Sequence, residues 1–220
     1  MPLPASAADL EAMARALELA SAALEAGEVP VGALVLDPDG GVIGEGRNLR
    51  EVDHDPTAHA EVVAMRRAAD AIGSWNLTGC TLVVSLEPCL MCAGAIVHAR
   101  IGRLVYGAPE PKTGAVRSAM QVLDTPSLNH HVEVVGGVLE RECRELIGAF
   151  FAQRRAGAMN FQRRVIAPQR RPVIFPGLVA LGHGEAEADQ EFGDRQRVVE
   201  PGLAHRRLPV GIHEKKYRSW

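Results

Sequence analysis

The chain has 220 residues, which suits one compact domain with an extension. Hydrophobic residues make up 47% of it and charged residues 23%, as in ordinary globular proteins, which argues against wholesale disorder. No apolar run approaches the roughly 20 residues that span a bilayer. The first residues lack a charged segment followed by an apolar core, so we expect no secretion signal. Four unevenly spaced cysteines do not suit a disulfide scaffold, which favours a reduced, cytoplasmic setting.

The net charge of −3 is distributed unevenly along the chain. Residues 1–155 carry 13 Lys and Arg against 20 Asp and Glu, a net −7, whereas residues 156–220 carry 11 against 7, a net +4. From Arg154 to Arg171 there are six arginines and no acidic residue. Such a basic stretch can meet phosphate groups, although a solvated run of charges is the alternative interpretation.

The first predicted element is a helix that begins after Ser6. Ser6 can cap it, and Asp9 lies three residues on, in the first turn that the helix dipole favours for an acid. Gly27 suits the C-terminal stop. The apolar residues that follow helical spacing, and that we expect on its buried face, are Leu10, Met13, Ala14, Leu17, Ala20 and Leu24.

Strands and helices then alternate. Residues 31–36 and 41–46 are predicted to form a hairpin around the turn DPDG at 37–40. The remaining predicted elements are helices at 60–72, 92–99 and 140–156 and strands at 81–85, 103–108 and 131–137. This order predicts a layered α/β domain in which helices cover the sheet.

The pattern changes after Gly157. Residues 158–220 contain five prolines and little sustained periodicity, and their one strongly apolar stretch, VIFPGLVAL at 173–181, is interrupted by Pro176. We therefore expect residues 1–157 to form the folded domain and residues 158–220 to be a Pro/Arg-rich extension that is flexible or weakly ordered.

Two short motifs carry the chemistry, HAE at 59–61 and EPCLMC at 87–92, and each opens a predicted helix. Cys89 and Cys92 are three residues apart and therefore share one face of the first helical turn. The positive end of the helix dipole lowers the pKa of a thiol there and favours the thiolate that a metal needs.

One imidazole, from His59, and two thiolates leave the fourth position of a tetrahedral zinc open to water, as in catalytic zinc sites. Glu61 is placed to accept the proton of that water and to deliver it later. The alternative interpretation is a pair of unrelated core cysteines and a surface histidine. Cys80 and Cys143 stand alone among apolar neighbours, and we expect them to be buried, inert thiols.

The two motifs together resemble the cytidine/deoxycytidylate deaminase superfamily, and their surroundings resemble its tRNA-specific adenosine deaminase branch. The resemblance covers roughly residues 5–157. It rests on VPVGALV (29–35), GEGRN (44–48), HDPTAHAE (54–61), SLEPCLMCAGAIVHARIGRLVYGA (85–108), KTGA (112–115), LNHHVEV (128–134) and FFAQRR (150–155).

The resemblance implies a three-layer α/β/α fold with a mixed five-stranded sheet, a homodimer, and conversion of adenosine to inosine at the wobble position of a tRNA anticodon. It implies one zinc ion held by His59, Cys89 and Cys92, with Glu61 as the proton shuttle. The residues that it places around the flipped base are Asn48, Val29, Ala60, Glu87 and Pro88.

The same resemblance makes the anticodon arm of tRNA the partner. Its candidate contacts are Glu110, Lys112, Arg154 and Arg155. Bacterial tRNA enzymes of this type usually have an Arg-Asp pair where this chain has Pro109 and Glu110. Pro109 removes a cation and an N–H donor, so the contact with substrate is expected to differ there.

Two other functions stay open at this point. A deaminase of a free base or nucleotide, such as guanine, cytosine or deoxycytidylate, would share the zinc motif. A non-catalytic, zinc-stabilised RNA-binding protein would have no need of Glu61. Asn48, the FFAQRR segment and the basic run beyond it favour the tRNA enzyme.

Overall fold

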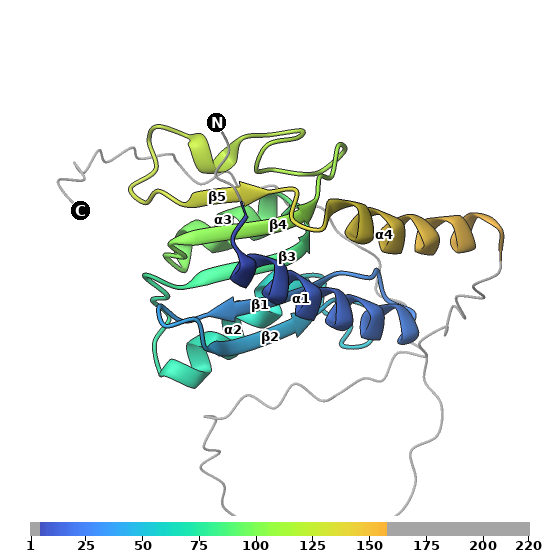
Figure 1. Cartoon of the computed structure of the whole chain (residues 1–220), viewed down its shortest axis with the longest axis horizontal. Helices are drawn as coiled ribbons and strands as arrows, with labels where there is room; N and C mark the ends of the chain where they lie inside the picture. Colours follow the sequence, from blue (N-terminus) through green and yellow to red (C-terminus); the bar gives the residue numbers. More distant parts are fainter. Residues whose placement is uncertain (1–4, 158–220) are drawn as a thin grey trace, which may run out of the picture. The chain divides into compact units, whose positions relative to one another are not determined.

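The computed structural model of the chain describes residues 5–157. Five strands form one sheet, and four helices accompany it (Figure 1). The strands are β1 (Gly32–Leu36), β2 (Val42–Arg47), β3 (Thr81–Leu86), β4 (Arg103–Ala108) and β5 (Glu133–Gly136). The helices are α1 (Ala7–Glu25), α2 (Ala60–Ile72), α3 (Leu90–His98) and α4 (Glu140–Arg155), with a short 3-10 turn η1 at Val122–Asp124. The predicted extension 158–220, with the apolar stretch 173–181, lies outside the described residues.

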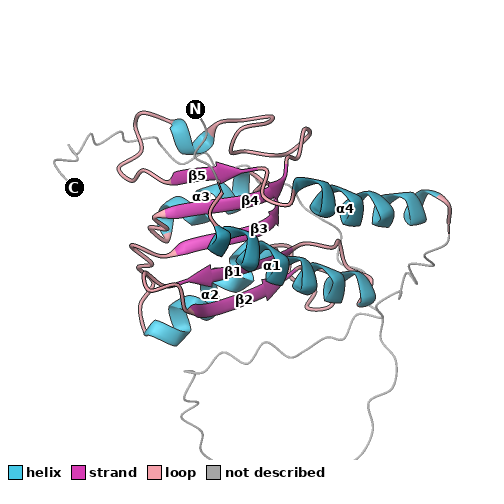
Figure 2. Ribbon diagram, in the orientation of Figure 1, coloured by secondary structure: helices cyan, strands magenta, loops and turns pink. Residues whose placement is uncertain are grey.

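The sheet is mixed, as predicted. Its strand order is β2-β1-β3-β4-β5, with β1 antiparallel to both neighbours and β3, β4 and β5 parallel. Parallel neighbours need a crossover connection, and α3 supplies it between β3 and β4. Helices α1 and α4 cover one face, and α2 and α3 cover the other (Figure 2). The three-layer α/β/α architecture is therefore confirmed.

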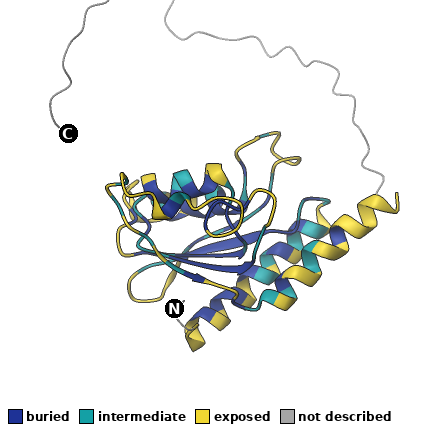
Figure 3. Cartoon of the chain, turned by 90° about the horizontal axis from the view of Figure 1, so that it is seen from above, coloured by how far each residue is buried: buried dark blue, intermediate teal, exposed yellow. Residues whose placement is uncertain are grey.

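Each face of the sheet has its own apolar core. Leu34, Val83 and Val105 point toward α1 and α4, while their neighbours Val84 and Leu104 point toward α2 and α3. This alternation is what a sheet buried on both sides requires. Figure 3 shows the result, with buried strands between helices whose outer faces are exposed. Within residues 5–157, no helix combines the length and apolar character needed to cross a membrane.

The predicted buried face of α1 is partly wrong. The cap is confirmed, since Ser6 and Asp9 form a reciprocal capping box, but Leu10 is 44% exposed and Ala14 is also exposed. The face that packs carries mainly small residues, among them Ala16 and Ala20. They are needed because the helix backbone approaches the sheet closely: a Cβ atom on Gly32 would lie 2.1 Å from the carbonyl oxygen of Ala16.

Helix α2 meets the sheet in the same way, at β2. A Cβ atom on Gly46 would lie 2.2 Å from the carbonyl oxygen of Ala60, and one on Gly44 would lie 2.4 Å from that of Ala64. Only glycine allows such an approach. The two glycines therefore set the depth at which the N-terminus of α2, with the HAE motif, lies on the sheet.

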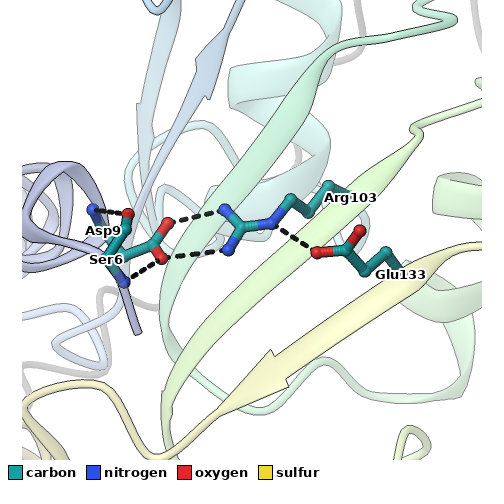
Figure 4. A network of polar contacts seen from close by, with 4 residues as sticks. All are labelled: Ser6, Asp9, Arg103 and Glu133. Atoms are coloured by element: carbon teal, nitrogen blue, oxygen red, sulfur yellow. Dashed lines mark hydrogen bonds and ion pairs between the residues drawn. The ribbon is translucent and has the colours of Figure 1, made fainter. Parts of the chain in front are cut away.

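A partly buried ion-pair network ties α1 to β4 and β5 (Figure 4). The guanidinium of Arg103 donates to both carboxylate oxygens of Asp9, at 2.6 and 2.9 Å, and its Nε donates to Glu133 at 2.8 Å. The backbone N–H of Ser6 donates to Asp9 as well. These bonds, chiefly those from Arg103, lower the pKa of the Asp9 carboxyl to about 2.

We expect this pair to make stability depend on pH in acid. The ordinary pKa of Asp9 is 3.8 and the folded value is about 2, so its contribution is complete above about pH 4 and is lost as the pH falls through about 2. The shift corresponds to about 2 kcal/mol. Asp9→Asn should therefore lower the free energy of unfolding by about 2 kcal/mol at pH 7 and by about half as much at pH 3.

Urea unfolding of both proteins at pH 7 and pH 3 measures the two differences. Glu11→Gln, at an exposed position on the same helix, is the matched control and should change stability by less than about 0.5 kcal/mol. An equal loss for Asp9→Asn at both pH values would contradict the shift.

Candidate active site

The site lies at one edge of the sheet, where several chain segments end. Strand β2 ends before Asn48, β3 ends before Glu87, and β4 ends before the segment that carries Glu110. Strand β1 runs in the opposite direction and starts at that edge, just after Val29. In open α/β sheets the carboxyl ends of parallel strands are the usual place for a ligand.

Three potential metal ligands meet at this edge. His59 and Cys89 are the residues that precede the first turns of α2 and α3, and Cys92 lies on the first turn of α3. The Cys89 Sγ lies 3.7 Å from His59 Nδ1 and 3.7 Å from Cys92 Sγ, and the Cys92 Sγ lies 3.5 Å from His59 Nδ1.

These separations match a tetrahedral ion. With Zn–S of about 2.3 Å and Zn–N of about 2.0–2.1 Å, the edges of a tetrahedron measure about 3.5–3.8 Å. The group formed by His59, Cys89 and Cys92 can therefore hold a metal. Three protein ligands leave a fourth position for water or substrate.

The electrostatics of the group suit a cation. Hydrogen bonding with Cys92 and with His59 lowers the pKa of the Cys89 thiol to about 3. The contact with Cys89, followed by burial, raises the pKa of Cys92. The contact with Cys89 also raises the pKa of His59. Two neighbouring sulfurs can both be thiolates only beside a positive charge, which a bound metal ion provides.

Glu61 lies on the first turn of α2 and is only 4% exposed. Its burial raises the pKa of the carboxyl. The side chain lines a pocket together with His59 and Cys89. A buried carboxyl beside potential metal ligands, yet outside that group itself, is suited to proton transfer.

The pocket encloses about 120 Å³, well below the roughly 300–1,000 Å³ of sites for drug-sized ligands. It therefore suits one small, flat ring system. The predicted site residues that line it are Val29, Asn48, His59, Ala60, Glu61, Glu87, Cys89 and Glu110. Sequence reasoning missed Val31, Arg50 and Thr113, which also line it. Arg50 lies two residues after the GEGRN motif, and Val31 and Thr113 lie within the VPVGALV and KTGA motifs, but no spacing rule marks them as pocket residues.

Other predicted residues lie elsewhere. Cys92 is buried and does not line the pocket. In the described part of the chain, Pro88, Lys112, Arg154 and Arg155 do not line this pocket. Arg154 and Arg155 end α4, where the guanidinium of Arg154 lies 5.6 Å from the centre of the Phe150 ring.

The carboxylate of Glu87 is engaged by the segment after β4. It accepts backbone N–H bonds from Glu110 at 3.0 Å, Val116 at 3.1 Å, Arg117 at 2.7 Å and Ser118 at 2.9 Å, and the Ser118 hydroxyl also donates to it. Burial raises the pKa of Glu87, but these bonds outweigh burial and hold that pKa below its usual value.

The backbone that follows Glu87 also bonds to the segment after β4. The carbonyl of Pro88 accepts the N–H of Ala115 at 2.8 Å, and Cys89 forms an isolated β-bridge with Gly114. A Cβ atom on Gly114 would lie 2.6 Å from the Glu87 carboxylate. Residues 110–118 are thus attached to the segment that supplies two of the three potential metal ligands.

The other two cysteines are as predicted. Cys80 and Cys143 are buried at 4% and 3% exposure. Burial raises the pKa of both thiols, that of Cys143 to about 11. They are therefore uncharged at neutral pH and suit packing rather than metal binding.

A mixed sheet of this order, with a His-Cys-Cys group and a buried glutamate at the starts of two helices, defines a deaminase with a cytidine-deaminase-like fold. Residues 7–155 match the family model of the MafB19-like deaminases. The chain is 50% identical over 147 residues to a tRNA-specific adenosine deaminase of Haemophilus influenzae, covering 67% of this chain and 85% of that protein. The chain therefore belongs to the MafB19-like deaminase family, among relatives that are tRNA-specific adenosine deaminases.

Solved structures agree with this assignment. One, from a study of A-to-I editing by tRNA:A34 deaminases at the wobble position, is 44% identical with a TM-score of 0.60 and covers 62% of this chain and 98% of that chain. A guanine deaminase from Nitrosomonas europaea has a similar TM-score, 0.59, but is only 26% identical. The match covers 69% of this chain and 88% of that chain.

Proposed function

We propose that the chain deaminates adenosine to inosine at the wobble position of a tRNA anticodon, releasing ammonia, and that it does so with zinc. The observation that carries the proposal is the tetrahedral spacing of His59, Cys89 and Cys92 beside the buried Glu61. The relatives named tRNA-specific adenosine deaminase, at up to 50% identity, supply the substrate class.

His59, Cys89 and Cys92 would hold one zinc ion per chain. Bound there, zinc supplies Lewis-acid chemistry that lowers the pKa of water toward 7. Glu61 takes a proton from the attacking water and gives a proton to the amine that departs from C6 of adenine. Because burial already raises its pKa, Glu61 can alternate between the two protonation states.

The pocket receives the flipped base. Val29 and Ala60 supply apolar wall, and Asn48 supplies a polar side chain that can donate and accept hydrogen bonds. Glu87 and Pro88 shape the opposite wall through the segment 110–118 that they hold. A volume of about 120 Å³ accommodates a base, and the sugar and phosphates stay outside.

The rest of the anticodon arm contacts the rim of the pocket. Glu110 lines the pocket, Lys112 follows it closely, and Arg154 and Arg155 provide cations at the end of α4. Each phosphate that such a cation neutralises contributes about −0.7 to the slope of log K against log salt on single-stranded RNA. Residues 1–157 form the deaminase domain in this proposal, and 158–220 are an extension to it.

A second copy of the chain covers an exposed apolar groove on the α2 and α3 side. The groove measures about 360 Å³ and is lined by Val62, Met65, Ala69, Trp75 and Ala95, among others. Trp75 is 68% exposed, an unusual position for a tryptophan unless it meets a partner. The homodimer interface lies at this groove. The protein acts in the cytoplasm, where tRNA is present and thiolates stay reduced.

Inosine mapping on total tRNA after incubation with the zinc-loaded protein tests the proposal. Inosine is expected at position 34 of a tRNA. Ammonia release from an anticodon stem-loop, guanine and cytosine is measured in parallel. Turnover of guanine without turnover of the stem-loop would assign the chain to the free-base deaminases instead.

Asn48→Ala is expected to lower kcat/KM on the stem-loop by about 10-fold or more, the usual loss when a hydrogen bond to a polar substrate group is removed. Zinc content should stay at the wild-type value, because Asn48 is not a ligand. Steady-state kinetics and elemental analysis on the same preparation measure both quantities. Unchanged kinetics would take Asn48 out of base binding.

A further inference from the structure

A second buried carboxylate lies behind the polar wall of the pocket. Glu28 follows the end of α1 and is 1% exposed. Its Oε1 atom accepts the backbone N–H groups of Glu51 at 2.8 Å and Val52 at 2.9 Å. Its Oε2 atom accepts the side-chain Nδ2 of Asn48 at 3.1 Å. Glu28 does not line the pocket, whereas Asn48 does.

The chemistry of these partners determines which way the Asn48 amide points. Both carboxylate oxygens of Glu28 are acceptors in these contacts, so the Asn48 amide turns its nitrogen, the donor, toward Glu28. The backbone of Asn48 is held in addition, since its N–H donates to the carbonyl of Val31 at 3.0 Å. The Asn48 Oδ1 atom is therefore directed away from Glu28. No residue in the described range 5–157 donates a hydrogen bond to it in the structure.

We propose that Glu28 is a positioning residue that makes Asn48 present its carbonyl oxygen, an acceptor, to the substrate. The inference rests on the proposed function and deepens it. A substrate group that donates a hydrogen bond is favoured at that wall, and a group that only accepts is disfavoured. The inverted amide is excluded because it would set its oxygen against the Glu28 carboxylate.

Glu28→Gln is the variant that separates orientation from packing, because it has the same shape. The backbone donors of Glu51 and Val52 keep the glutamine oxygen on their side, so the glutamine nitrogen faces Asn48. Asn48 then inverts and turns its own nitrogen to the pocket. We expect kcat/KM on an anticodon stem-loop to fall about 10- to 100-fold, with zinc content and melting temperature little changed.

The reciprocal change should restore the acceptor. Asn48→Asp alone sets two carboxylates against each other and should lower kcat/KM at least as far as Glu28→Gln. In the double variant that combines Glu28→Gln with Asn48→Asp, the glutamine nitrogen donates to one oxygen of the introduced carboxylate at position 48. The other oxygen of that carboxylate faces the pocket. The double variant should therefore be more active than either single variant. Glu25→Gln, at an exposed position three residues earlier, is the matched control and should retain wild-type kinetics.

A readout without turnover keeps this inference separate from the proposed function. In 15N-labelled, zinc-loaded full chain, the side-chain amide signals of Asn48 are those lost in Asn48→Asp. They should shift and exchange faster with water in Glu28→Gln, because the nitrogen leaves the buried carboxylate. Unchanged signals, or a double variant with the product of the two single losses, would overturn the role of Glu28. Failure of the wild type to deaminate the stem-loop would overturn the assignment of the substrate. The amide signals of Asn48 would then still test the role of Glu28.

Discussion

Glu61→Gln should retain zinc and RNA binding and lose a factor of about 10² to 10⁴ in kcat, the usual contribution of a positioned general acid and base. The amide of glutamine has the same shape as the carboxyl but cannot accept a proton from water. The carboxyl lies in the first turn of α2, two residues after His59, and is buried. The isosteric change should therefore leave the fold intact.

Single-turnover deamination of a stem-loop, zinc content and RNA affinity measured on one preparation separate the chemical step from binding. Asp70→Asn, at an exposed position near the other end of the same helix, is the matched control and should keep wild-type kcat. A zinc-replete Glu61→Gln protein with near wild-type kcat would show that another group moves the proton.

The group of His59, Cys89 and Cys92, which can hold a metal, could be predicted because the information for it is local. Cys89 and Cys92 are three residues apart, so any helix that begins there places both sulfurs on one side. His59 opens a helix whose predicted span, 60–72, is the one observed. The alternation of strands and helices likewise predicted the layered sheet, because helices that alternate with strands pack on the faces of the sheet.

The residues that sequence reasoning missed depend on contacts between distant segments. Glu28 acts across 20 residues on Asn48, and Thr113 reaches the pocket because Glu87 holds residues 110–118 beside it. The buried face of α1 was misjudged at Leu10 because its spacing was read without the sheet beneath it. The backbone of α1 approaches the sheet closely at Gly32, so alanines fit there better than larger apolar residues. The spacing of apolar residues within the helix does not indicate that close approach.

The wild type is expected to hold about one zinc ion per chain, and Cys89→Ala and Cys92→Ala should each lose it. Each variant should also lose activity by at least about 10³-fold, because water then lacks the cation that lowers its pKa. Two remaining ligands hold zinc too weakly for it to survive dialysis. Cys80→Ala is the matched control, since Cys80 is buried, as Cys92 is, but lies outside the group of potential metal ligands. It should keep both zinc and turnover and lose only packing stability. Elemental analysis after dialysis decides the matter, and full zinc in both ligand variants would mean that the sulfurs at the start of α3 do not hold the metal.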